Sequence, residues 1–104
     1  MITSTTESIP GHHIITNLGV VYGNTVRAKH VGRDIMAGLK TIVGGEVRGY
    51  TEMLQESRNQ ATDRMVAQAK AMGADAIVNI RFTTSQVAQG MSEMLAYGTA
   101  VKLG

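Results

Sequence analysis

Three histidines are the first residues in this chain whose chemistry suggests a metal site. His12 and His13 are adjacent, and adjacent side chains of an extended strand point to opposite faces. They could bind one ion together only if they lie in a loop. His30 stands alone, and no HxH, HxxxH or HxE spacing is present. These spacings do not exclude a site shared between subunits. Within one chain, we interpret the three histidines as surface or loop residues.

Two carboxylates on a predicted helix form the second candidate. Glu52 and Glu56 are four residues apart, which places them on one face of that helix. Such a pair can bind a hard cation or work as an acid/base pair. It is more often a solvated helix surface, and we expect Arg58 and Arg64 on or near the same surface.

Motifs for nucleophilic catalysis and for nucleotide binding are missing from the sequence. Ser92 follows Gly90-Met91 but lacks the GxSxG spacing, and there is no P-loop and no GxGxxG. The chain has no cysteine, which excludes disulfides and thiolate metal sites. An enzyme is therefore not indicated by any specific pattern.

The charge distribution argues against nucleic-acid and membrane partners. The net charge is +2, and the ten Lys and Arg are scattered among acidic residues. A nucleic-acid-binding surface usually gathers its positive charge in one stripe beside stacking aromatics. Residues 1–10 lack the basic and apolar regions of a secretory signal, and no run approaches the roughly 20 apolar residues that span a bilayer. We expect a cytoplasmic protein.

The elements that would position these residues follow from the spacing of apolar side chains. At 104 residues the chain is expected to form one domain, residues 1–104. In residues 14–22 the apolar or β-branched side chains fall on even positions, which predicts a half-buried strand whose odd face is partly covered. Gly19 inside this strand suggests a bulge or a close backbone contact. A shorter extended segment is expected at residues 3–7, before the Pro10-Gly11 turn.

Two helices are predicted next. Apolar residues recur at helical spacing over residues 31–42, and Gly44-Gly45 ends this first helix. The second helix starts at about residue 47 or 50, ends at Gly73, and is long enough to cross a whole domain. Its predicted buried stripe consists of Tyr50, Leu54, Ser57, Ala61, Met65, Ala69 and Met72.

Two more strands complete the predicted fold. Residues 76–83 alternate between apolar and polar, and residues 95–103 alternate larger side chains with Ala and Gly. A polar loop over residues 85–92 would join them as an antiparallel pair. The expected class is α+β, with two helices packed on one face of a small, mostly antiparallel sheet in the order β-α-α-β-β. Four aromatic residues and many small ones make a thin core, which favours oligomerisation.

Several short segments resemble the YbjQ-like family. They are Val31-Gly32-Arg33-Asp34, Ile42-Val43-Gly44-Gly45-Glu46, Tyr50 with Leu54, Arg58 with Ala61, Gly73-Ala74-Asp75-Ala76, and Gly98-Thr99-Ala100-Val101. The resemblance implies a dodecin-like sheet and a homo-oligomeric ring, with a pentamer expected. The family carries the label of a putative heavy-metal-binding domain. At its polar positions, Asp34, Glu46, Tyr50 and Arg58, we expect a ligand-binding or subunit-contact surface.

The leading hypothesis is a homo-oligomeric module that binds a small ligand or a metal ion. A structural or interaction protein without a ligand, and an enzyme with an unfamiliar site, are the alternatives. The absence of cysteine argues against a soft-metal role, because thiolates are the ligands that select soft ions. Subunit contact is favoured over ligand binding for the four polar residues, since such groups commonly serve capping and pairing.

Overall fold

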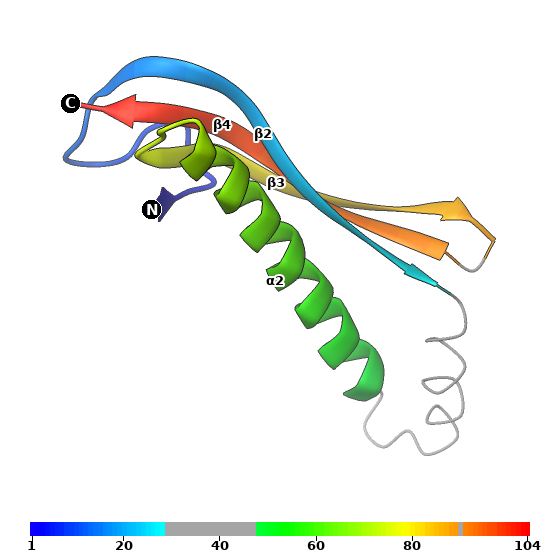
Figure 1. Ribbon diagram of the computed structural model, residues 1–104. Helices are drawn as coiled ribbons and strands as arrows, with labels where there is room; N and C mark the ends of the chain where they lie inside the picture. Colours follow the sequence, from blue (N-terminus) through cyan, green and yellow to red (C-terminus); the bar gives the residue numbers. More distant parts are fainter. Residues whose placement is uncertain (29–47, 90) are drawn as a thin grey trace.

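A four-stranded sheet with one helix across one face makes up the described part of the chain (Figure 1). The computed structural model describes residues 1–28, 48–89 and 91–104. The strands are β1 (Ile2–Thr3), β2 (Ile14–Ala28), β3 (Ala76–Ala88) and β4 (Met91–Leu103), and the helix is α2 (Arg48–Ala71). Their order in the sheet is β1-β3-β4-β2, with β1 parallel to β3 and the other pairs antiparallel.

The predicted α+β class is confirmed, and the sheet is mixed because of the short parallel strand β1. The described residues contain one helix on one face of this sheet, where two were expected. The predicted helix over residues 31–42 and the Gly44-Gly45 turn lie outside the described residues. Within the described ranges, no helix has both the length and the apolar character needed to cross a bilayer.

The three long strands extend further than the sequence predicted. β2 continues to Ala28, and β3 and β4 stay paired through Ser85 with Glu93 and Gln86 with Ser92. The predicted polar loop over residues 85–92 is therefore wrong, because most of it is a hairpin. Backbone pairing needs no apolar side chain, so a strand whose faces are largely exposed can consist of Ser, Thr and Gln.

The side chains of β2 do not face the way that their spacing predicted. After the bulge at Gly19 the odd positions face α2, so Val21 is buried while Val20 and Tyr22 are 67% and 55% exposed. The register shifts between Asn17 and Gly19, and Gly19 has a φ of +118°. An inserted residue reverses the alternation, because side chains repeat every two residues. The bulge suggested by Gly19 is thus confirmed, and the prediction of a covered even face is wrong.

Small side chains occupy the sheet surface beneath α2. On β4 it is Ala96, Gly98 and Ala100 that are buried, while the larger Tyr97 is exposed on the other face. The predicted stripe of α2 is confirmed in its central part, where Ala61, Met65 and Ala69 are fully buried, and Leu54 and Met72 are largely exposed. The main core comprises Val21, Ala61, Met65, Ala69, Ile77, Ile80, Met94, Ala96 and Ala100.

At Gly23 the backbones of β2 and α2 lie close together. A Cβ atom at this position would overlap the carbonyl oxygen of Ala61 and the amide nitrogen of Met65. Both are main-chain atoms of the helix, which cannot rotate away as a side chain can. The position of α2 on the sheet therefore requires glycine at residue 23.

Gly23→Ala is expected to destabilise the fold by at least about 3 kcal/mol, because relief of the overlap requires displacement of the whole helix. Urea unfolding measures the change. Gly11→Ala is the control: its added methyl group meets nothing within 4 Å, and the φ of +81° costs about 1 kcal/mol for a residue with a Cβ. Equal losses in the two variants would contradict the role given to Gly23.

Asp75 connects the end of α2 to the last residues of β4. Its Oδ2 accepts a hydrogen bond from the Leu103 amide at 2.9 Å, and its Oδ1 lies 3.4 Å from Lys102 Nζ. The hydrogen bond from the Leu103 amide lowers the pKa of the Asp75 carboxyl below its ordinary value; desolvation opposes this effect, and the charge and hydrogen bond of Lys102 add smaller lowering effects.

A lowered folded-state pKa makes Asp75 stabilising above its unfolded pKa of about 3.9, and this stabilisation is lost as the pH falls through the folded value. We expect Asp75→Asn to lose stability at pH 7 and to approach the wild type once the pH falls below the folded-state pKa of Asp75. Thermal melts across this pH range measure the difference. A constant difference in stability between the two proteins at every pH would contradict the assignment.

Candidate functional site

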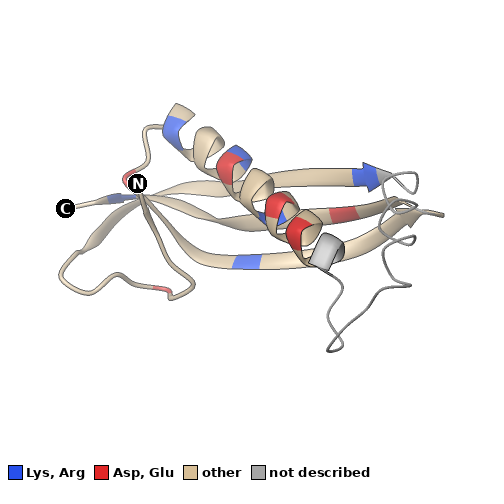
Figure 2. Cartoon of the chain, turned by 90° about the horizontal axis from the view of Figure 1, so that it is seen from below, with Lys and Arg blue, Asp and Glu red and all other residues tan. Residues whose placement is uncertain are grey.

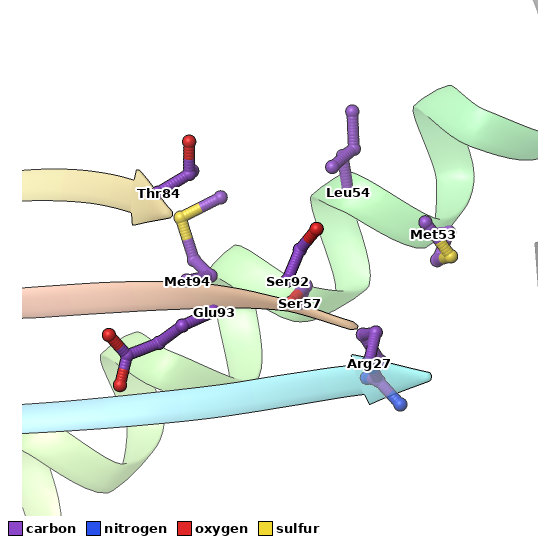
Figure 3. A pocket seen from close by; sticks show the side chains of 8 residues that line it. All are labelled: Arg27, Met53, Leu54, Ser57, Thr84, Ser92, Glu93 and Met94. Atoms are coloured by element: carbon purple, nitrogen blue, oxygen red, sulfur yellow. The ribbon is translucent and has the colours of Figure 1, made fainter. Parts of the chain in front are cut away.

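A cavity of about 170 Å³ lies between the N-terminal half of α2 and the ends of the three long strands (Figure 3). It is located at the end of the sheet opposite the chain termini, where β2 and β3 end and β4 begins. Its lining is mainly apolar. The residues that line it are Arg27, Met53, Leu54, Ser57, Thr84, Ser92, Glu93 and Met94.

The strand register determines which side chains reach this cavity. Met94 on the central strand pairs with Thr25 of β2 and with Thr84 of β3, so these three residues share the face that α2 covers. Ser57 on α2 is buried above them, and its hydroxyl lies 2.5 Å from the hydroxyl of Thr25. This hydrogen bond joins the helix to the sheet at the inner end of the cavity.

Arg27 lines the cavity with its stem, while its charged end is held outside. The Nη2 atom donates to Gln60 Oε1 at 3.2 Å and lies 3.9 Å from Glu56 Oε1, and neither partner lines the cavity. The Nε atom is buried and has no hydrogen-bond partner among the described residues. The residues that line the cavity therefore combine apolar side chains with several hydroxyl groups and with Arg27, whose Nε–H donor is unused.

The size and lining of the cavity define the ligands that it could hold. An engineered apolar cavity of about 150 Å³ in another protein binds benzene, so a volume of this order accepts a single small ring. The Ser57 hydroxyl is bonded to Thr25, which is neither a general base nor an acid. Within the described residues, the arrangement is suited to binding a small molecule and contains no activated nucleophile.

The four polar residues expected at a functional surface are only partly placed. Asp34 and Glu46 lie outside the described residues, and Tyr50 lies in the first turn of α2, where only the backbone is described. Arg58 is exposed on α2, one turn beyond Leu54. The surface proposed for these residues stays a prediction.

The cavity itself was not predicted from the sequence, although one signal pointed to it. Ser57 is the only small hydroxyl residue in an otherwise apolar helical stripe, and such a residue, once buried, needs a partner. That partner, Thr25, lies 32 residues earlier in the chain, and no local pattern connects the two.

The described side chains do not form a donor set for a metal ion. His12 and His13 are exposed between β1 and β2, and His30 lies outside the described residues. Glu52 and Glu56 are exposed, as expected for a solvated helix face. No group of three His, Cys, Asp or Glu side chains in the described ranges is close enough to bind an ion.

Methionine thioethers, which are soft metal ligands, do not supply the missing donor set either. Two methionines, Met53 and Met94, line the cavity, but Figure 3 shows their sulfur atoms on opposite sides of it. Two donors so placed cannot complete the coordination of one ion. The described residues therefore do not fit a heavy-metal centre.

Comparisons with known proteins match the chain over its full length. The YbjQ family model, described as "Putative heavy-metal-binding", matches residues 1–104. A UPF0145 protein of Shewanella frigidimarina is 65% identical over 104 residues, covering 100% of this chain and 97% of the relative. A UPF0145 protein of Archaeoglobus fulgidus is 61% identical over 103 residues, which cover 99% of this chain and 95% of the relative.

The fold is also similar to a solved structure. The crystal structure of a protein of unknown function from the DUF74 family of Pediococcus pentosaceus has a TM-score of 0.66 at 16% identity. The structural match covers 100% of this chain and 98% of the Pediococcus chain.

Removal of the Ser57 hydroxyl tests the bond that joins α2 to β2. Ser57→Ala leaves the buried Thr25 hydroxyl without a partner, and we expect a loss of about 1–2 kcal/mol in urea unfolding. Because Thr25→Val removes the same bond, the double variant is expected to lose less than the sum of the single losses. Thr84→Val, at an exposed hydroxyl of the same cavity, is the control and should change stability by less than about 0.5 kcal/mol. Additive losses for Ser57 and Thr25 would contradict the coupling.

Proposed function

Because the chain belongs to the YbjQ family, we propose that it is a homo-oligomeric module that binds a small, largely apolar ligand in the cavity under α2. The observation that carries this proposal is the cavity itself, which combines walls formed by Met53, Leu54 and Met94 with a few polar groups. Binding sites for small molecules have this composition: apolar walls for affinity and isolated polar groups for orientation. We place the module in the cytoplasm, the location expected from the sequence.

A small organic ligand is better supported than a metal ion. Arg27, Ser92 and Thr84 are among the residues that line the cavity, and the Nε atom of Arg27 is buried without a hydrogen-bond partner. These groups suit one polar substituent on a small ring or short chain. The metal alternative has no matching donor set among the described side chains.

Self-association is supported by large apolar side chains that the described strands leave exposed, among them Val20, Tyr22, Phe82 and Val87. Exposed apolar surface of this kind is a common site of contact between proteins. A ring, with five subunits as the resemblance implies, is the assembly that we propose.

Phenol is a suitable probe of the cavity, since it is a single ring with one hydroxyl group. With methionine methyl groups labelled with ¹³C, we expect phenol to shift the Met53 and Met94 signals with a Kd of about 1 mM. Met72, which follows the C-terminal end of α2 and does not line the cavity, is the internal reference.

Leu54→Trp is expected to fill the cavity and weaken phenol binding at least tenfold, while Val87→Trp, at an exposed position outside the lining, should leave it unchanged. Unshifted Met53 and Met94 signals in the wild type would sink the ligand proposal. A solution mass equal to one chain of 11.1 kDa would sink the oligomer.

A further inference from the structure

Arg27 brings a positive charge to the lining of the cavity. It is the only charged residue of β2, and most charges of the described chain lie on α2 (Figure 2). The three long strands together carry four charged residues, which are Arg27, Arg81, Glu93 and Lys102. Arginine is rarely buried unless its guanidinium is paired. The partners of Arg27 therefore decide whether its charge is already neutralised.

The contacts of this guanidinium leave one donor unused and its charge weakly balanced. Nη2 donates to the neutral amide oxygen of Gln60 at 3.2 Å, and Glu56 Oε1 lies 3.9 Å away, beyond hydrogen-bond distance. The Glu56 side chain is 76% exposed, so water screens its charge. The Nε–H group of Arg27 is buried and has no hydrogen-bond partner among the described residues. A buried donor in this state costs free energy that an acceptor would recover.

Ser92 supplies a second donor next to Arg27. The two residues pair directly across β2 and β4, and both line the cavity. Side chains that are directly opposite in an antiparallel pair lie on the same face of the sheet, with Cβ atoms about 4.5–5.5 Å apart. A hydroxyl group can donate to an acceptor that a neighbouring N–H group also binds. Arg27 and Ser92 can therefore share one acceptor.

The carboxylate among the described lining residues is directed elsewhere. Glu93 precedes the buried Met94 on β4, so its side chain lies on the face of the sheet away from α2. Its Oε2 accepts a hydrogen bond from Asn24 Nδ2 at 3.0 Å, and Figure 3 shows the carboxylate turned away from Arg27. The charge of Arg27 is therefore not neutralised by Glu93.

We propose that the ligand of this cavity is a small apolar monocarboxylate, of the size of an aromatic acid with one ring. Its apolar part lies between Met53, Leu54 and Met94. One carboxylate oxygen accepts hydrogen bonds from the Arg27 Nε–H and the Ser92 hydroxyl. This inference rests on the proposed function and names the class of ligand for the same site.

Size and charge together select this class. A volume of about 170 Å³ accepts a single ring, since an engineered apolar cavity of about 150 Å³ in another protein binds benzene. The remaining space suits one small substituent beside Arg27 and Ser92. Hydrogen bonds between a cationic N–H and an anionic oxygen are shorter and stronger than bonds between neutral groups. A carboxylate at this position therefore gains more than a neutral group of the same shape.

Benzoate and benzamide test the proposal as a matched pair, because they share the ring and nearly the same shape but differ in charge. At pH 7 we expect benzoate to bind the wild type about tenfold more tightly than benzamide. The ¹³C-labelled methyl groups of Met53 and Met94 report both titrations at the same salt concentration. Equal affinities of the two compounds would overturn the carboxylate proposal.

Arg27→Met keeps an unbranched apolar stem and removes the donor and the charge. We expect this variant to bind benzoate no more tightly than benzamide, and its affinity for benzamide to change by less than about threefold. Arg64→Met is the matched control. Arg64 also joins α2 to β2, through a hydrogen bond to the Asn24 carbonyl at 2.5 Å, but it does not line the cavity. Its removal should leave the preference for benzoate unchanged.

Ser92→Ala provides a second measurement at a position that is exposed and tolerant of substitution. Loss of this hydroxyl is expected to weaken benzoate binding about threefold and benzamide binding less. Circular dichroism checks that each variant is folded. If Arg27→Met does not fold, the wild-type comparison and Ser92→Ala still decide the proposal.

The outcomes separate this inference from the proposed function. If neither compound shifts the Met53 and Met94 signals, the cavity binds no small ring and the proposed function is overturned. If benzamide binds and benzoate binds no more tightly, only the carboxylate class is overturned. A preference for benzoate that survives Arg27→Met, or that is lost equally in Arg64→Met, overturns the role of Arg27.

Discussion

The direct contact between β2 and α2 at Gly23 is the constraint on which the rest of this structure depends. With no side chain at this position, the helix backbone at Ala61 and Met65 lies against the strand backbone. Ala96, which pairs with Gly23 on the central strand, and Gly98, two residues further along that strand, are also small and buried. Close approach of backbones maximises dispersion contacts, and in this way a core with few aromatic residues reaches adequate density.

Close packing just past the middle of the helix accompanies the cavity under its N-terminal half. At Gly23 the helix lies on a residue without a side chain, whereas further toward its N-terminus Met53 and Leu54 line the cavity together with Met94 of β4. α2 consequently diverges from the strands toward the end where β2 and β3 finish (Figure 1). Hydroxyl groups occur at the start of this divergence, where Thr25 and Ser57 bond to each other. The cavity follows from a straight helix that is fixed at one end of a twisted sheet.

The sequence predicted the helices and strands better than it predicted which of their faces are buried. The long helix, its central stripe and the existence of the strands follow from spacing, because helix and strand periods are local properties. The buried face of β2 was missed because a single bulge at Gly19 reverses the alternation, and no count of apolar residues contains that shift. The cavity was not predicted for a related reason, because it depends on the distance between α2 and the sheet. That distance is set at Gly23, whose contacts are with residues 38 and 42 positions later in the sequence. The spacing of apolar residues within one segment contains no information about contacts between segments so far apart in the sequence.

The proposed assembly and the proposed ligand site are physically connected. Leu54 and Thr84 line the cavity, and both are exposed to solvent. A second copy that covered them would shield one side of the cavity from water and so strengthen each polar contact inside it. A ligand that contacts both copies binds the assembly more tightly than the single chain, and by thermodynamic linkage it stabilises the assembly by the same free energy. The proposed ligand and the proposed assembly would therefore stabilise each other.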